Sequence, residues 1–441
     1  MAIISIIGHK GGVGKTTLSI NIAAALTQAL NQKQSNNQVC LFDLDLRLPT
    51  ITGILNSHPK KTFFDLFETL ANQTYQIDLL QTLYSILIRF KRHVNGDTTF
   101  DDRPQLQKSI AVYKNMNIEL FNFSQYEFGN QLHELFLNRG VIHRPSDIKK
   151  KAFNDLLNRI DIDRVKKVMR DNEENARPEI NEYISYIEEY GFSILGGEVP
   201  ILGKKSHRNR INEPEFLALF LEFIHGVCEK FDHVVLDTPA GGVNHVSSLM
   251  NTIDQVLFVF DISNNIAVKG SIDALHTFID YYEDFYKNYT QGLLTGLDKS
   301  YVDKLITERG EKAVTQALAN KKMSIIFNRC KKTKEISPCL DQLREYLETL
   351  DQYEEYKDRI RLVGLMPDHK IINITNNRGT IFYGKDKTLS NRINTIARSI
   401  LNEDVVYPTL AYSNSEIQTY LEKQSHMGFS NTLNRIASGL S

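Results

Sequence analysis

The sequence has almost no net charge, few cysteines and no long apolar run. Its 52 Lys and Arg against 53 Asp and Glu give a formal net charge of -1, so global charge does not indicate a nucleic-acid binder. The four cysteines form no C-x-x-C pair, and neither a disulfide framework nor a zinc site is indicated. No stretch approaches the roughly 18 uninterrupted apolar residues of a transmembrane helix. The apolar start is too short for a signal peptide, and we expect a cytoplasmic protein.

What is present is typical of a soluble globular protein. Hydrophobic residues make up 41% of the chain and charged residues 24%, which excludes a fully disordered, collagen-like or coiled-coil chain. The length of 441 residues allows two or three domains, or one large elaborated domain.

The N-terminal segment has the order strand, glycine-rich loop, helix. Residues 2–7 (AIISII) are apolar and mostly β-branched, residues 8–17 read GHKGGVGKTT, and residues 18–30 have a helical composition. Glycines let the backbone amides approach phosphate oxygens, while Lys15 can reach the β- and γ-phosphates and the Thr16 hydroxyl can bind Mg²⁺. The order of elements predicts a nucleotide-binding loop made of Gly11, Gly12, Val13, Gly14, Lys15, Thr16 and Thr17.

A second lysine in this loop makes the pattern more specific. Lys10 is not required by a general phosphate-binding loop, and residues 10–17 (KGGVGKTT) resemble the deviant Walker A motif of the ParA/MinD family of ATPases. The resemblance implies ATP or ADP and Mg²⁺ as cofactors, weak intrinsic ATP turnover and an ATP-dependent homodimer. In that dimer Lys10 would reach the phosphates of the partner's nucleotide, where it would cancel charge as an arginine finger does.

Acidic residues follow two further predicted strands. Asp43 and Asp45 end the strand of residues 38–44, and their i, i+2 spacing places them on one face at the end of a sheet where ligands bind. The resemblance implies that Asp45 orients the attacking water and that Asp43 supports Mg²⁺. Asp237 ends the strand of residues 233–237 in a Walker B arrangement and would hold Mg²⁺ through water. Each carboxylate could instead be a polar strand end or a helix cap.

The residues after Asp45 resemble another branch of the same superfamily. The pattern D-x-D-x-R-x-P is closer to the bacterial tyrosine kinases, which lack the signature lysine and carry a tyrosine-rich tail. Lys10 is present here and the tail holds only Tyr412 and Tyr420, so the kinase is a minor alternative.

Two later strands supply the expected nucleotide-base contacts. An amide such as that of Asn328, after the strand of residues 323–327, can pair with an adenine edge, although it could equally cap the next loop. By resemblance Asn328 contacts the base, and Pro367 and Asp368 close over the adenine. Apolar residues at helical spacing in 387–402 predict a helix that docks on the core.

These motifs predict an α/β fold, a doubly wound and mostly parallel sheet with flanking helices and an inserted helical subdomain. Residues 1–54 and 226–405 form the ATPase core, and 406–441 a helical tail. Residues 55–225 are expected to be largely helical insertions, with helical spacing at 64–90, 153–170 and 178–190, around a core strand near 117–122. A helix is also expected at 271–290, with a core-facing aromatic stripe of Phe278, Tyr282, Phe285 and Tyr289.

Three functions fit these features. The first is an ATP-driven dimeric switch for DNA or plasmid partition or cargo positioning, stimulated by a partner protein, with non-specific DNA contacts through basic loops near 204–210. The second is a regulatory ATPase scaffold in a defence or secretion system, whose helical insertions bind a protein. The third, metabolic phosphoryl transfer, has no marker in the sequence. The tail helix carries too little positive charge for a membrane anchor, so membrane binding is not expected.

Overall fold

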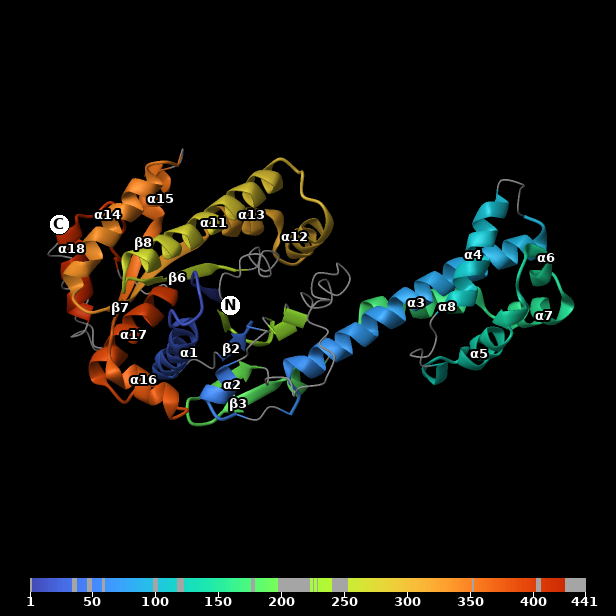
Figure 1. The fold of residues 1–441 in the computed structure, drawn as a ribbon, viewed down its shortest axis with the longest axis horizontal. Coiled ribbons are helices and arrows are strands. Elements are labelled where there is room, and N and C mark those ends of the chain that lie inside the picture. Colours follow the sequence, from blue (N-terminus) through green and yellow to red (C-terminus); the bar gives the residue numbers. More distant parts are fainter. Residues whose placement is uncertain are drawn as a thin grey trace. The chain divides into compact units, whose positions relative to one another are not determined.

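In the computed structural model, eight described strands form one sheet in the order β3-β4-β2-β5-β1-β6-β7-β8 (Figure 1). All neighbouring strands are parallel except β3 and β4, which are antiparallel. The strands are β1 (Ala2–Ile7), β2 (Val39–Asp43), β3 (Ile184–Ile187), β4 (Phe192–Leu195), β5 (His233–Asp237), β6 (Gln255–Asp261), β7 (Lys322–Cys330) and β8 (Ile360–Pro367). The expected α/β class with a mostly parallel sheet is confirmed.

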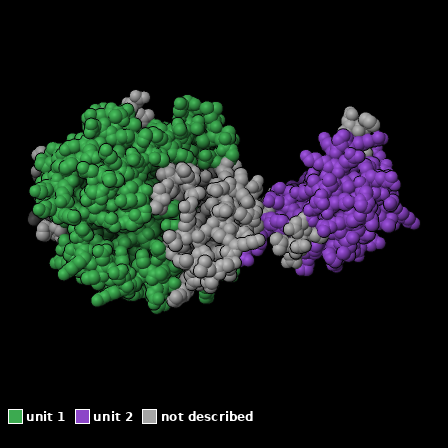
Figure 2. Space-filling view, viewed as in Figure 1, with its two compact units in different colours: residues 1–67, 179–441 green, residues 68–178 purple. Residues whose placement is uncertain are grey.

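The structure describes residues 2–33, 38–45, 50–57, 60–97, 102–116, 123–175, 179–196, 223–224, 226–227, 229–239, 253–350, 353–401 and 406–424. The chain divides into unit 1, made of Met1–Phe67 and Glu179–Ser441, and unit 2, made of Glu68–Pro178 (green and purple in Figure 2). Unit 1 holds the sheet, and the described elements of unit 2 are helices.

Helices cover both faces of the sheet in unit 1 (Figure 1). On one face α1 packs against α17, β2 and β5, and on the other α11 packs against β6 and α14. Because both faces are covered, the central strands are buried along their whole length, which explains their continuous apolar sequences. The helices of this unit are α1 (Lys15–Gln32), α2 (Ile51–Ile54), α11 (Asn265–Thr290), α12 (Gly296–Arg309), α13 (Glu311–Ala319), α14 (Ile336–Leu347), α15 (Tyr353–Arg359), α16 (Lys370–Asn377), α17 (Lys387–Ile400) and α18 (Asn414–Lys423).

Unit 2 has a hydrophobic core of its own. Leu83, Leu87, Tyr113, Leu132 and Leu157 are fully buried in one cluster, to which all six described α-helices of the unit contribute. The Tyr113 hydroxyl donates a 2.6 Å hydrogen bond to the Leu135 carbonyl, so its buried polar atom is satisfied. The helices are α3 (Phe63–Asn95, which begins in unit 1), α4 (Arg103–Asn115), α5 (Gly129–Leu137), α6 (Pro145–Ile148), α7 (Lys151–Arg159) and α8 (Ile162–Asn175).

One predicted helix is wrong. Residues 178–190 were expected to be helical, but β3 and β4 form a hairpin across 184–195 that adds two strands to the sheet beside β2. Gly191 ends the turn with φ 74°, a left-handed conformation that suits glycine. The charged residues of this segment suggested an exposed helix, whereas the antiparallel pairing of β3 with β4 and the turn at Gly191 make it a hairpin. The expected helical stretch at 153–170 is divided into α7 and α8, and the Asp161 carboxylate caps α8 by accepting the N–H groups of Asp163 and Arg164.

Three predicted helices are confirmed. The stretch 64–90 lies in α3, and 271–290 lies in α11, which starts earlier because the Asn264 side chain caps it by accepting the Ala267 N–H. Phe278, Tyr282 and Phe285 are buried, so the aromatic stripe belongs to the core. Helix α17 is the expected docking helix, with its apolar residues buried: Leu389, Ile393, Ile396 and Ile400.

Several sequence predictions fall outside the described residues. These are the strand near 117–122, the residues of the kinase-like pattern at 46–49, the basic loop 204–210, the segment after Pro239 and the end of the tail.

Candidate nucleotide-binding site

The glycine-rich loop joins β1 to α1 at the carboxyl edge of the sheet, as predicted. Gly12 and Gly14 have φ of 75° and 95°, in the left-handed region that side chains disfavour. At Gly14 a Cβ atom would also lie 2.4 Å from the Asn328 amide nitrogen. A side chain at residue 14 is therefore disfavoured for two reasons. It would strain the backbone, and it would collide with Asn328 at the end of β7. The loop leads into the N-terminus of α1, whose exposed N–H groups and dipole favour an anion.

Lys15 is the buried cation of this loop, with 7% of its surface exposed. Its ammonium donates a 3.1 Å hydrogen bond to the Lys10 carbonyl. Burial lowers the pKa of Lys15, and the negative charges of Asp237 and Asp45 oppose that shift. The negative charge of a bound phosphate group would offset the free-energy cost of burying this ammonium.

Asp237, at the end of β5, is tied directly to α1. Its carboxylate accepts hydrogen bonds from the Thr16 hydroxyl at 2.6 Å and the Ser19 hydroxyl at 2.9 Å. Burial raises the pKa of Asp237, and these two hydrogen bonds oppose the shift. Ser19 was not predicted from the sequence, although its position three residues after Thr16 places both hydroxyls on one face of the helix.

Asp43 is fully buried beside Asp237, its partner in the register of β2 and β5. Its carboxylate accepts the backbone N–H groups of Asp45, Thr50 and Ile51 at 2.8–3.1 Å. Burial and the negative charge of Asp237 raise the pKa of Asp43, while these three hydrogen bonds oppose the shift. Both oxygens of Asp43 thus hold the backbone that carries Asp45 to the pocket.

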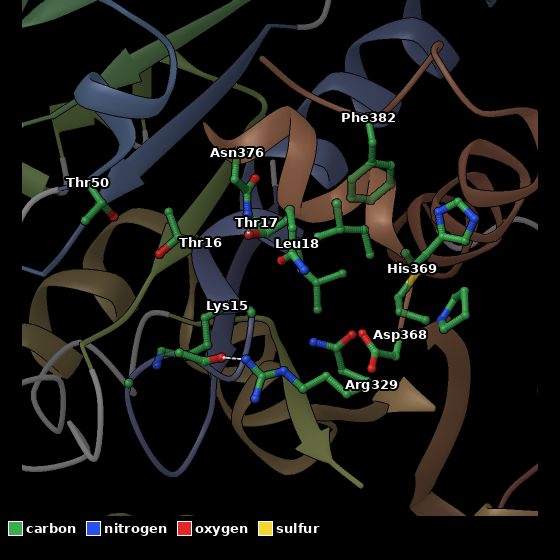
Figure 3. Close-up of a pocket in the computed structure, with 18 of the residues that line it drawn as sticks. Lys15, Thr16, Thr17, Leu18, Thr50, Arg329, Asp368, His369, Asn376 and Phe382 are labelled. Atoms are coloured by element: carbon green, nitrogen blue, oxygen red, sulfur yellow. Dashed lines mark hydrogen bonds between the residues drawn. The ribbon is translucent and has the colours of Figure 1, made fainter. Parts of the chain in front are cut away.

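A pocket of about 360 Å³ lies along the glycine-rich loop (Figure 3). It brings together most of the predicted residues, from Gly11 through Thr17 (Val13 apart), with Asp45, Asn328, Pro367 and Asp368. Met366, Ile372 and Phe382 add apolar surface, and Thr50, Thr238, Arg329, His369, Asn373 and Asn376 add polar groups.

The amide of Asn328 points to the loop itself. It donates a 2.7 Å hydrogen bond to the Val13 carbonyl, and Arg329 donates to the Gly12 carbonyl. The end of β7 therefore supports two successive carbonyls of the loop. From the other side, the amide of Asn376 on α16 donates to the Thr17 hydroxyl at 2.9 Å. Arg329 and Asn376 were not predicted, because their place in the site depends on how β7 and α16 pack.

Lys10 lies beside the pocket rather than in its lining. Its ammonium is 4.0 Å from the Asp261 carboxylate at the end of β6, and about half of its side chain is exposed. Two runs of basic residues in the described part of the chain, Lys149–Lys151 and Lys331–Lys332, are exposed. None of the helices in the described part of the chain is long and apolar enough to cross a membrane.

A comparison of the sequence with known protein families identifies the family to which the chain belongs. The CobQ/CobB/MinD/ParA nucleotide binding domain, CbiA, matches residues 4–381. The chain belongs to this family. It is therefore a nucleotide-binding protein of the ParA/MinD type, as the glycine-rich loop suggested.

Individual proteins also resemble the chain, over a short segment or over most of its length. The antiactivator FleN of Pseudomonas aeruginosa is 39% identical over 66 residues, which are 15% of this chain and 21% of FleN. The match therefore spans about a fifth of that curated relative. Among solved structures, the cell division ATPase MinD of Pyrococcus furiosus is 14% identical, with a TM-score of 0.43, covering 91% of this chain and 98% of MinD. McdA of Cyanothece is 11% identical, with a TM-score of 0.45, covering 91% and 99%.

Proposed function

We propose that the protein binds and hydrolyses ATP and that ATP binding closes a homodimer, which acts as a switch in positioning DNA or another cargo. The observation that carries this proposal is the convergence of Lys15, Thr16, Asp45 and Asp237 at one end of a parallel sheet. A buried ammonium, a hydroxyl and two carboxylates beside a helix N-terminus are suited to a nucleotide triphosphate and its cation.

The residues present fit a magnesium ion. The Thr16 hydroxyl and the Asp237 carboxylate are hard oxygen groups in contact at the base of the loop, and Mg²⁺ is usually held by few protein oxygens together with water and phosphate. When bound, the ion would neutralise charge on the phosphates. Thr16 would be the direct ligand and Asp237 would act through water. Asp43, whose carboxylate accepts the backbone N–H groups of Asp45, Thr50 and Ile51, would support the shell of the ion without binding it directly.

Different groups of the chain would then bind the phosphates, orient the attacking water and neutralise the charge on the transferring phosphoryl group. Loop amides and Lys15 bind the phosphates, and the Asp45 carboxylate orients the attacking water and accepts its hydrogen bond. Lys10 of the partner subunit would reach the transferring phosphoryl group, so turnover would depend on dimer formation. Met366, Ile372 and Phe382 offer an apolar slot for the base, with Asn328, Pro367 and Asp368 at its rim.

A second candidate is a regulatory ATPase scaffold whose partner is a protein. The observation that favours it is unit 2, which has its own buried core and is not needed to build the described nucleotide pocket. In this case unit 2 would bind the partner and DNA would not be needed.

Light scattering with ADP and with ATP tests the switch. We expect the mass to double with ATP in the wild type and to stay that of a monomer in Lys10→Ala. Adding non-specific DNA at two salt concentrations then separates the candidates. Salt-sensitive binding by the ATP form supports DNA positioning, whereas a dimer that ignores DNA supports the scaffold. A mass that is the same with ADP and ATP would overturn the switch.

A further inference from the structure

Asp261, at the end of β6, is a buried carboxylate with two cations beside it, and it does not line the nucleotide pocket. Its side chain has no exposed surface. One oxygen accepts the Ser263 N–H at 3.0 Å, and the other lies 3.4 Å from the Arg329 guanidinium and 4.0 Å from the Lys10 ammonium. A buried carboxylate needs such partners, because an unpaired buried charge is strongly unfavourable.

The two cations are held very differently. Arg329 also donates to the Gly12 carbonyl, and its backbone has φ 59°, which is uncommon for a residue with a side chain. The Arg329 guanidinium therefore has two described partners, the Gly12 carbonyl and the Asp261 carboxylate, and it reaches the loop beside the pocket (Figure 3). The Lys10 side chain is about equally exposed, at 49% against 45% for Arg329, but it lies on a flexible stem and Asp261 is its described ion-pair partner.

We propose that Asp261 is a positioning residue that holds Lys10 on its own subunit until the ATP-bound dimer forms. Arg329 stays with Asp261 when Lys10 leaves, so the carboxylate is never left without a cation. This inference rests on the proposed dimeric switch, in which Lys10 must move to the partner's nucleotide.

The arrangement has a direct consequence for the monomer–dimer equilibrium. Every ATP-driven dimer must first break two Lys10–Asp261 pairs, one in each subunit. Removing the negative charge of Asp261 should therefore favour the dimer and leave nucleotide binding by the monomer unchanged. Because the Lys10 end of the pair is exposed, its strength is modest, and we expect the dimer dissociation constant with ATP to fall about threefold to tenfold.

The experiment compares dimer dissociation constants with ATP by light scattering over a range of protein concentrations. Asp261→Asn keeps the shape and can still accept the Ser263 N–H, and Asp261→Thr gives a second uncharged variant suited to a strand end if Asn folds poorly. Asp261→Glu restores the charge and should return the constant toward wild type. Asp303→Asn removes an exposed carboxylate on α12 and serves as the matched control.

The readouts separate a positioning role from a merely structural one. A fluorescent ADP analogue should bind all variants within about twofold of wild type. In the Lys10→Ala background, which is expected to stay monomeric with ATP, Asp261→Asn should not restore the dimer. If the wild type dimerises with ATP and the uncharged variants do so equally well or less well, the inference is overturned and the switch stands. If the wild type itself does not dimerise, the proposed function fails.

Discussion

The Thr16 hydroxyl donates a 2.6 Å hydrogen bond to the Asp237 carboxylate, although 221 positions separate the two residues. This contact joins the first helix to β5, the strand beside β1, at the base of the glycine-rich loop. The ATP site is thus assembled from distant parts of the chain, and each part can be tested separately.

The first prediction concerns Lys15. Replacing it by alanine should weaken ATP binding about 100-fold, because the charge-assisted contacts of a buried ammonium to phosphate are lost. Calorimetric titration with ATP measures this. Lys33→Ala, just after the other end of α1, is the matched control and should bind normally. Equal affinities for the Lys15 variant and the wild type would contradict the assigned phosphate site.

The second prediction separates binding from turnover. Asp45→Ala should bind ATP within about twofold of wild type and lose about 100-fold in turnover, because the water is no longer oriented. Phosphate release during the steady state measures the loss. If turnover is unchanged, Asp45 does not have the role proposed for it.

The third prediction concerns the backbone at Gly14. Alanine there would have to adopt φ 95° with its Cβ atom against the Asn328 amide, so we expect the loop to be displaced and ATP affinity to fall about tenfold. Gly140→Ala is the control, since a Cβ at that position meets nothing within 4 Å and its φ is not positive. Normal ATP binding by Gly14→Ala would show that the loop conformation is not required.

The fourth prediction concerns pH and unit 2. The Asp147 side chain pairs with Lys150 and accepts the N–H groups of His143 and Arg144, and these contacts hold its pKa well below the usual range. An acid with a lowered pKa stabilises the fold at pH values above its unfolded pKa of about 4, and this contribution is lost as the pH falls through the folded pKa. Asp147→Asn should therefore reduce amide protection at His143 and Arg144 at neutral pH.

Hydrogen exchange at about pH 7 and about pH 3 checks this prediction. The difference in protection between wild type and variant should be full at the higher pH and should begin to shrink at the lower pH, which lies below the unfolded pKa of about 4 but above the folded pKa of Asp147. A difference that does not depend on pH would mean that the charge of Asp147 is unimportant and only its shape matters.

Much of the nucleotide site could be predicted because its residues lie within one short motif or at the ends of recognisable apolar strands. Gly12, Gly14 and Lys15 lie in one loop, and Asp43 and Asp237 end apolar strands whose parallel order brings their carboxyl ends together. These predictions need only the order of elements along the chain.

The remaining features depend on tertiary packing. Arg329 and Asn376 reach the loop only because β7 and α16 pack against it, and no motif marks either residue. The β3–β4 hairpin was missed because its short strands lie among charged residues, and a four-residue strand leaves too few positions to show alternation against a helical period.

The core of unit 2 has an evolutionary consequence. Its buried residues all come from a continuous stretch of the chain, from Leu79 to Val165, while the nucleotide pocket draws on other segments. Substitutions that reshape unit 2 can therefore accumulate without touching the residues that select the nucleotide. We expect descendants of this chain to diversify faster in residues 68–178 than in the segments that line the nucleotide pocket.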